Sequence, residues 1–268
     1  MRLQLLLLGS LVAMSACGSS SADNASSNVS QCPDESTKGS LVVLAASSMA
    51  PVFANAEEQL LAENPCITDV AFSYGSSATL AAQIVNGSPA DVFISASEKT
   101  MKTVTEKDRT VSSTIFARNS GEIMVSPNAK YDGGITDIAS LTDAVNAGIK
   151  VGLCVTTAPC GALADSILSK AGISRRAIAD TETPSVEDLV SKIEMGELDA
   201  GIVFHSDCVS AQNQKSSQCI SIPPDMNAST SYYVAALNSR AVTQQFTGFI
   251  SSPSFIGILQ SKFGFLAP

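Results

Sequence analysis

The sequence predicts an α/β protein in which parallel strands alternate with helices. Short apolar runs that suit buried strands, at 41–44, 70–74 and 92–95, are separated by segments that read as helices. The first two of these strands are each followed by a pair of serines and then by a helix. With 268 residues, the chain is long enough for two modest lobes or one large domain.

The first residues have the pattern of an export signal. Arg2 precedes an apolar run at 3–8 and small residues up to position 16, and this run is too short to span a membrane. The sequence MSACG at 14–18 resembles a bacterial lipoprotein cleavage site, so we expect a signal peptide at 1–16 and a lipid on Cys17. An ordinary secretory signal is the alternative. Residues 17–38, rich in Ser, Asn, Asp and Gly, are expected to form a flexible tether.

Charge and composition argue against several classes of function. The net charge of −9 disfavours nucleic acid as a partner. It does not exclude an anionic ligand, because nearby hydrogen-bond donors can outweigh distant charges that salt screens. The single histidine, His205, argues against a histidine-rich metal site and against a default Ser-His-Asp triad.

The cysteines predict disulfides. Seven are present, and six remain if Cys17 carries a lipid. An even number in an exported protein suggests bridges, and six cysteines allow fifteen pairings. A catalytic thiol or a thiolate metal site is the alternative, although the sequence contains no CxxC motif. Proximity in the sequence favours two short bridges and leaves one long one: Cys154–Cys160, Cys208–Cys219 and Cys32–Cys66.

The stretch 73–95 organises the rest of the chain. The strand at 70–74 turns through GSS into a helix at 78–85, Asn86 and Gly87 end that helix, and a buried strand follows at 92–95. Ser76 and Ser77 are N-cap candidates. The first amides of a helix lack partners, and the helix dipole is positive there, so such a turn can hold an oxyanion. The alternative is that the serines only cap the helix.

A second unit repeats this arrangement. The strand at 41–44 leads through Ser47 and Ser48 into a helix at 49–61, with Pro51 in its first turn. In a parallel sheet both helix N-termini lie at the carboxyl edge of the strands, where open α/β sheets bind ligands.

The remaining elements follow the same alternation. An extended stretch at 111–125 is expected to make the first crossing between lobes, and 231–237 to return to the first lobe. A polar loop is expected at 212–219. Helices are expected at 97–107, 137–147, 162–170, 187–195, 242–250 and 253–262, and further extended segments at 150–154, 179–183, 200–204 and 220–222.

Three motifs carry a resemblance to a known family. AASSM at 45–49, GSSATLAAQIVNGSPADVFISAS at 75–97 and AGIVFHSD at 200–207 resemble the periplasmic-type molybdate-binding proteins of ABC transporters, over roughly residue 39 to the end. The resemblance implies a two-lobed, type II periplasmic-binding-protein architecture with a ligand cleft between the lobes. It implies a first lobe at 39–120 and 226–268 and a second at 121–225.

The resemblance also implies the function. The protein would be a lipid-anchored extracytoplasmic receptor, a monomer, that captures molybdate or tungstate and delivers it to an ABC permease. Neither a cofactor nor an enzymatic activity is expected, and molybdenum would enter only as the oxyanion. A receptor for sulfate, phosphate or another oxyanion is the alternative. A secreted hydrolase using Ser48 or Ser77 is a third reading, but neither serine has a histidine nearby in the sequence and no GxSxG motif is present.

The family motifs imply the residues that bind the anion. The hydroxyls of Ser48 and Ser77 would come from the first lobe, and the backbone amides of Cys160 and Val186 from the second. The fifth position departs from the pattern, because Phe204 stands where the family has a tyrosine. Phenylalanine cannot donate a hydrogen bond, and losing one donor to an anion weakens binding by about 1.5–3 kcal/mol unless something replaces it.

Other polar residues have simpler interpretations. Water, His205 or a nearby threonine could replace the missing donor, and Ser47 and Ser76 are possible extra donors. Asp91 is expected to fix the turn before residue 92 rather than to act as a ligand or an acid. His205 is expected at the surface or the cleft edge, and the tyrosines are read as packing residues: Tyr131, Tyr232 and Tyr233.

Overall fold

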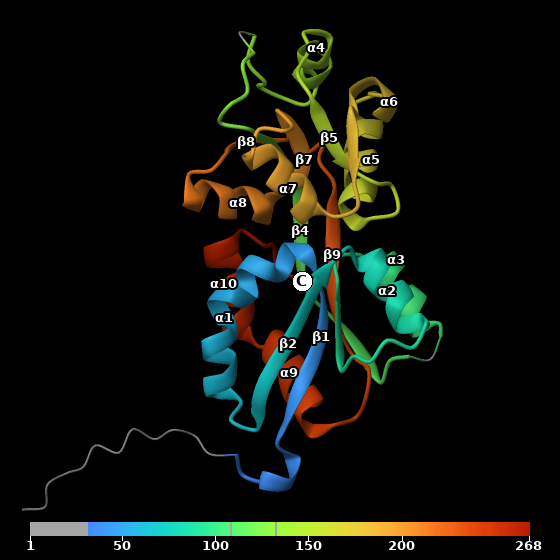
Figure 1. Ribbon diagram of the computed structural model, residues 1–268, viewed down its shortest axis with the longest axis vertical. Coiled ribbons are helices and arrows are strands. Elements are labelled where there is room, and N and C mark those ends of the chain that lie inside the picture. Colours follow the sequence, from blue (N-terminus) through green and yellow to red (C-terminus); the bar gives the residue numbers. More distant parts are fainter. Residues whose placement is uncertain (1–31, 108, 132) are drawn as a thin grey trace, which may run out of the picture.

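The computed structural model describes residues 32–107, 109–131 and 133–268. Figure 1 shows the elements gathered in two groups, one above the other, which we call the first lobe (lower) and the second lobe (upper). The expected signal peptide and Cys17 lie outside the described residues. All described strands belong to one nine-stranded sheet system, and helices cover it, which confirms the predicted α/β class.

The first lobe begins with parallel strands. β1 (Gly39–Ala46) lies between β2 (Ile67–Gly75) and β3 (Val92–Ser95), and all three run parallel. β9 (Ser229–Ala236) pairs with β3 in the antiparallel sense. After the short 3-10 turns η1 (Glu35–Thr37) and η2 (Ser47–Met49), the helices of this lobe are α1 (Ala50–Glu63), α2 (Ser77–Val85), α3 (Glu98–Thr105), α9 (Ala241–Ile250) and α10 (Pro253–Phe263).

The second lobe repeats the pattern on a smaller sheet. β5 (Val151–Cys154) runs parallel to β6 (Thr181–Thr183) and β7 (Ala200–Phe204). β8 (Gln218–Ser221) pairs in the antiparallel sense with β4 (Ser112–Val125). The helices of this lobe are α4 (Ser140–Asn146), α5 (Pro159–Lys170), α6 (Arg175–Ile178), α7 (Val186–Glu194) and α8 (His205–Gln214).

One long strand connects the lobes. The first part of β4 (Ser112–Val125) pairs with β9, and its last part, from Gly121, pairs with β7 and β8. Asn227 fixes the returning chain to this strand, since its side chain accepts from the Gly121 nitrogen and donates to the Gly121 oxygen, each at 3.0 Å. β4 and β9 therefore form the double connection between lobes (Figure 1).

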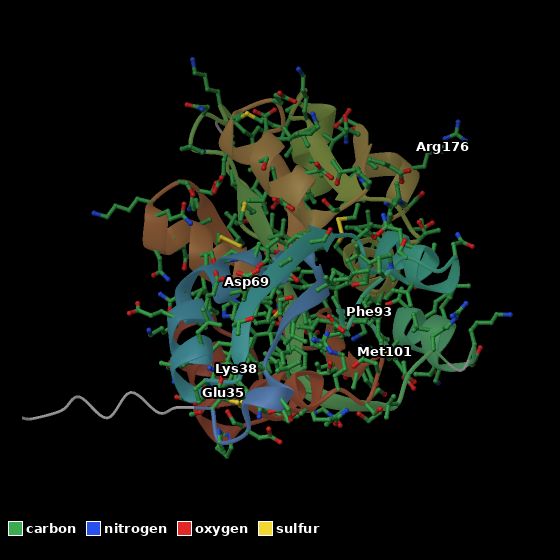
Figure 2. All side chains as sticks on the ribbon, turned by 60° about the horizontal axis from the view of Figure 1, so that its bottom comes forward. Glu35, Lys38, Asp69, Phe93, Met101 and Arg176 are labelled. Carbon is green, nitrogen blue, oxygen red and sulfur yellow. A yellow bond between two sulfur atoms is a disulfide. The ribbon has the colours of Figure 1, made fainter. Side chains whose placement is uncertain are left out.

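The core is continuous across the lobes, with a small satellite. In the satellite, Leu80 and Ile84 of α2 pack with Phe93 of β3 and Met101 of α3 on one face of the first-lobe sheet; Figure 2 labels the last two. The apolar residues of α2 face this cluster, as the helical period predicts. Ala81 of the same helix is also buried in this cluster, whereas Val85 is only partly buried.

The six described cysteines form three disulfides, with the pairing that sequence proximity favours: Cys32–Cys66, Cys154–Cys160 and Cys208–Cys219.

The largest error of the sequence prediction follows β7. The stretch 212–219, expected as a polar loop, contains the end of α8 and the start of β8. Helix α8 has few apolar residues, so it lacks the periodicity that reveals a helix, and the Cys208–Cys219 bridge and the packing of Cys208 and Ala211 hold it instead. The short helix α6 was also missed.

Candidate functional site

A small pocket lies between the lobes, at the carboxyl ends of the parallel strands. Its walls are the turns that follow the strands of both lobes. All five residues that the motifs single out line it. The lining consists of Ala46, Ser47, Ser48, Gly75, Ser76, Ser77, Ala96, Pro159, Cys160, Ser185, Val186 and Phe204.

The first lobe brings two serine hydroxyls to the pocket. Ser48 lies in the η2 turn between β1 and α1, and Ser77 is the first residue of α2. Their exposed fractions are 4% and 1%. Ser76 occupies the N-cap position of α2, yet its side chain makes no capping hydrogen bond. Ser76 and Ser77 therefore do not simply cap α2.

The Ser77 hydroxyl is held from behind. Its oxygen accepts a hydrogen bond from the backbone nitrogen of Ala96 at 3.0 Å. A hydroxyl that accepts one bond still has its own hydrogen to donate. Ser77 can therefore donate into the pocket.

The second lobe brings helix N-termini. Cys160 lies in the first turn of α5, which has no side-chain cap, and Val186 is the first residue of α7. The first amides of a helix have no partner within it, so these N–H groups are free to serve the pocket. Ser185, the N-cap of α7, accepts from the Asp188 nitrogen and donates its own hydrogen to the Asp188 carboxylate at 2.6 Å. Ser185 thus caps the helix and leaves the pocket to the Val186 amide.

Phe204 provides an apolar wall. Its ring lines the pocket and is 2% exposed. Its backbone nitrogen donates to the Asp207 carboxylate at 3.1 Å. Phe204 therefore offers the pocket no donor from its side chain, and its amide is already used.

Sequence reasoning missed one polar residue behind the pocket. Tyr232, read as a packing residue, is fully buried, and its hydroxyl oxygen lies 2.7 Å from the Ser48 hydroxyl. Its ring meets the Phe204 ring edge-on, with centroids 5.9 Å apart. Burial raises the pKa of the Tyr232 phenol far above its usual range, so it stays protonated. The sequence feature that could have indicated its place near the pocket was its position on the strand that returns between the lobes.

Charged groups stay out of the pocket lining. Every described residue that lines the pocket is neutral. A larger cleft of about 610 Å³ opens beside it between α1, α7 and α8, and it carries three carboxylates, those of Glu187, Glu194 and Asp207. Burial raises the pKa of Asp207 to about 7. Because acidic side chains line it, the larger cleft is the less suitable place for an anion.

The pocket is small. It has about 200 Å³ of empty space, and most of the side chains that line it are buried. Cys160 and Val186 are each 3% exposed. Because the lining comes from both lobes, a movement of one lobe against the other would change the width of the pocket.

Two other candidates lie outside the pocket lining. Asp91 stands before β3, at the opposite end of that strand, where it accepts from the Val42 nitrogen at 2.8 Å. His205 begins α8, and its Nδ1 lies 2.6 Å from the Glu122 carboxylate, a contact that raises the histidine pKa. Among the residues with described positions, no cluster of histidine, cysteine and acidic side chains could hold a metal ion.

Comparison with known proteins places the chain in a family. A family model described as bacterial extracellular solute-binding protein matches residues 41–266. The chain belongs to this family. A relative from Mycobacterium tuberculosis, named molybdate-binding protein ModA, is 32% identical over 259 residues, which are 94% of this chain and 92% of that protein. This confirms the resemblance that the three motifs indicate.

Two solved structures share the fold. The periplasmic molybdate-binding protein of Azotobacter vinelandii superposes with a TM-score of 0.71 at 21% identity, covering 85% of this chain and 99% of that one. The sulfate-binding protein SubI of Mycobacterium tuberculosis superposes with a TM-score of 0.69 at 16% identity, covering 84% and 86%. The predicted two-lobed architecture is confirmed.

Within 32–107, 109–131 and 133–268, no helix is both long and apolar enough to cross a membrane.

Proposed function

We propose that this protein is an extracytoplasmic receptor that captures molybdate, and also tungstate, between its lobes and delivers it to an ABC permease. The observation that carries the proposal is the pocket between the lobes, in which neutral hydrogen-bond donors from both lobes converge. The ligands would be the hydroxyls of Ser48 and Ser77 and the backbone amides of Cys160 and Val186, with Phe204 as an apolar wall.

The chemistry of the donors suits a fully ionised tetrahedral anion. Such a dianion presents four oxygens that accept hydrogen bonds and none that donates. Hydroxyls and the free amides of helix N-termini supply donors, and the helix dipoles add positive potential, without any lysine or arginine. Size would decide between anions, because a cage matched to the longer metal–oxygen bonds of molybdate leaves sulfate with weaker contacts.

Capture would require the lobes to move. We propose lobe 1 at 39–120 and 226–268 and lobe 2 at 121–225 as the two units, with the crossings in β4 and before β9 as the hinge. The composition of the pocket supports this, since its lining residues come from both units.

The cellular setting belongs to the same proposal. A lipid on Cys17, after removal of a signal peptide at 1–16, would hold the receptor at the membrane through a tether. The tether would end before Cys32 and not at residue 38 as the sequence predicted, because the Cys32–Cys66 disulfide holds 32–38, with its η1 turn, against the first lobe. The receptor would act at the membrane as a monomer that meets its permease. A binding role without catalysis fits a pocket in which the serines have no histidine beside them.

Sulfate or phosphate is the second candidate ligand. Phe204 favours it, because the donor that the molybdate-binding motif has at this position is missing. The structural likeness to a sulfate-binding protein adds to this candidate.

A thermal-shift comparison tests the proposal. The protein that begins at Gly18, which retains every described residue, is melted with equal excess of molybdate, tungstate, sulfate or phosphate. A ligand at about a hundred times its Kd adds roughly 2.7 kcal/mol to the free energy of unfolding. We expect shifts with molybdate and tungstate alone. A shift of the melting temperature with sulfate or phosphate alone would make that anion the ligand in place of molybdate. No shift with any of the four anions would overturn the receptor function.

A further inference from the structure

A chain of buried polar side chains runs from the second lobe to Ser48. Ser206 of α8, Asn119 of β4 and Tyr232 of β9 form it, and each is at most 2% exposed. The Asn119 Nδ2 atom donates to the Ser206 hydroxyl at 2.8 Å. Burial raises the pKa of the Tyr232 phenol, and the Asn119 side chain opposes this effect as a nearby donor. Tyr232 in turn meets the Ser48 hydroxyl at 2.7 Å.

The direction of this chain is fixed at Asn119. Its Oδ1 atom accepts from the backbone nitrogen of Ser120 at 3.0 Å, so the oxygen cannot exchange places with the nitrogen. The Asn119 amide nitrogen therefore faces the hydroxyls of Ser206 and Tyr232 as a donor. The buried Tyr232 phenol is protonated, and among the described residues the Ser48 oxygen, at 2.7 Å, is the acceptor within reach of its single hydrogen.

We infer that Tyr232 is a positioning residue that holds Ser48 as a hydrogen-bond donor toward the bound anion. The inference rests on the proposed function. Because the Ser48 oxygen accepts from Tyr232, the hydrogen of Ser48 is left for the pocket. The Ala96 amide does the same for Ser77. Both serines thus present hydrogens to the pocket.

The surroundings of Tyr232 keep its hydroxyl in place. The ring is packed edge-on against three phenylalanines, with centroids 5.9 Å from Phe204, 6.3 Å from Phe116 and 5.2 Å from Phe265. The pocket lining includes Phe204 and Ser48 but not Tyr232. Tyr232 therefore acts through Ser48 and does not touch the ligand.

A consequence for specificity follows. A pocket whose hydroxyls only donate rejects an anion that carries a proton, because the hydrogen of that anion meets no acceptor. Phosphate carries a proton at neutral pH and molybdate does not. Without the Tyr232 hydroxyl, Ser48 can turn and accept, so discrimination against hydrogen phosphate should decrease.

A double-mutant cycle tests the inference. Kd values for molybdate and phosphate are measured by calorimetry for the wild type, Tyr232→Phe, Ser48→Ala and the double variant. Tyr232→Phe should bind molybdate about tenfold more weakly, with a lower ratio of molybdate to phosphate affinity. In the Ser48→Ala background the same change should cost no further affinity. The matched control is Tyr233→Phe, the next tyrosine on β9, which should leave both Kd values unchanged.

Other outcomes separate the two hypotheses. A wild type that binds no oxyanion would overturn the proposed function and this inference together. If the wild type binds molybdate and Tyr232→Phe binds it equally well, or loses the same affinity with and without Ser48, the positioning role is wrong and the receptor function stands. Asn119→Ala provides a second variant. It keeps the Tyr232 hydroxyl but removes the neighbouring donor that orients it, so it should also weaken molybdate binding.

Discussion

The hydroxyl oxygen of Ser77 lies 3.0 Å from the backbone nitrogen of Ala96, which places the start of α2 directly against the end of β3. The amide has only a hydrogen to give, so Ser77 accepts and keeps its own hydrogen for the pocket. The hydrogen bond from Ala96 therefore orients the Ser77 hydroxyl at the start of α2 as a donor toward the pocket.

Replacing Ser77 by alanine should therefore weaken anion binding. Removing one hydroxyl that donates to a charged ligand costs about 1.5–3 kcal/mol, which corresponds to a Kd roughly ten to a hundred times higher. Calorimetric titration with molybdate measures this change.

The matched control is Ser252→Ala, at the N-cap of α10, where the hydroxyl accepts from the Phe255 nitrogen at 3.2 Å. This variant should lower the free energy of unfolding by about 1 kcal/mol and leave the Kd unchanged. Equal Kd values for the wild type and Ser77→Ala would show that the hydroxyl is not a ligand.

The disulfides offer a comparison between stability and binding. Cys154–Cys160 closes the turn that carries the Cys160 amide, and Cys32–Cys66 ties the start of the described chain to β2. Loop entropy predicts that replacing the short bridge by two serines costs about 2 kcal/mol of stability, and the longer one roughly 4 kcal/mol.

Affinity should follow the opposite order. The Cys154→Ser, Cys160→Ser variant should bind molybdate more weakly because its turn is free to move, whereas the Cys32→Ser, Cys66→Ser variant should bind with the wild-type Kd. Chemical unfolding and calorimetry on the same samples give both quantities. Equal affinity in the two variants would contradict a role for the short bridge in binding.

Asp91 should matter for stability alone. Its carboxylate accepts from the Val42 nitrogen, from Asn238 at 2.7 Å and from Arg240 at 2.9 Å. About 16 Å of extended chain separates it from Ala96 at the pocket. Asp91→Ala should lower the free energy of unfolding by about 2–3 kcal/mol, measured by urea unfolding, with an unchanged Kd. A large loss of affinity would instead make Asp91 a candidate ligand again.

The sequence was informative where local chemistry decides structure. The turn after residue 74 combines glycine, serines and an apolar helix, and β3 follows as the structure has it, Val92–Ser95. The motifs also identified five residues that are far apart in the sequence and line one pocket. Within each lobe, the parallel strands place their carboxyl ends at one edge, and the pocket lies where the edges of the two lobes meet.

Features that depend on tertiary contacts were missed. Helix α8 is polar and is held by a disulfide and by packing, so its sequence gives no helical period. Tyr232 looks like an apolar core residue, and only the structure shows its hydroxyl against Ser48. Likewise, Asp207 gives no sign in the sequence that it is buried behind Phe204.

Burial of Asp207 predicts that stability decreases as pH rises. In the unfolded chain this carboxyl has its ordinary pKa of 3.8, whereas burial raises the folded pKa to about 7. Between these values the folded state binds more protons, so the free energy of unfolding falls with pH. His205 adds to the same trend. Its pKa is raised by Glu122, so the stability it contributes is present below its unfolded pKa of 6.5 and is lost above the folded one.

The melting temperature of the ligand-free protein should therefore fall by several degrees between pH 5 and pH 8, since about 1 kcal/mol corresponds to 2–4 °C in a chain of this size. Asp207→Asn retains an oxygen that can accept from the Phe204 nitrogen but cannot ionise, so it should flatten most of the slope. Glu122→Gln should remove only the part due to His205, near and above pH 6.5. If Asp207→Asn and the wild type show the same slope, the Asp207 carboxyl is not the group that titrates, and the pH dependence arises elsewhere in the protein.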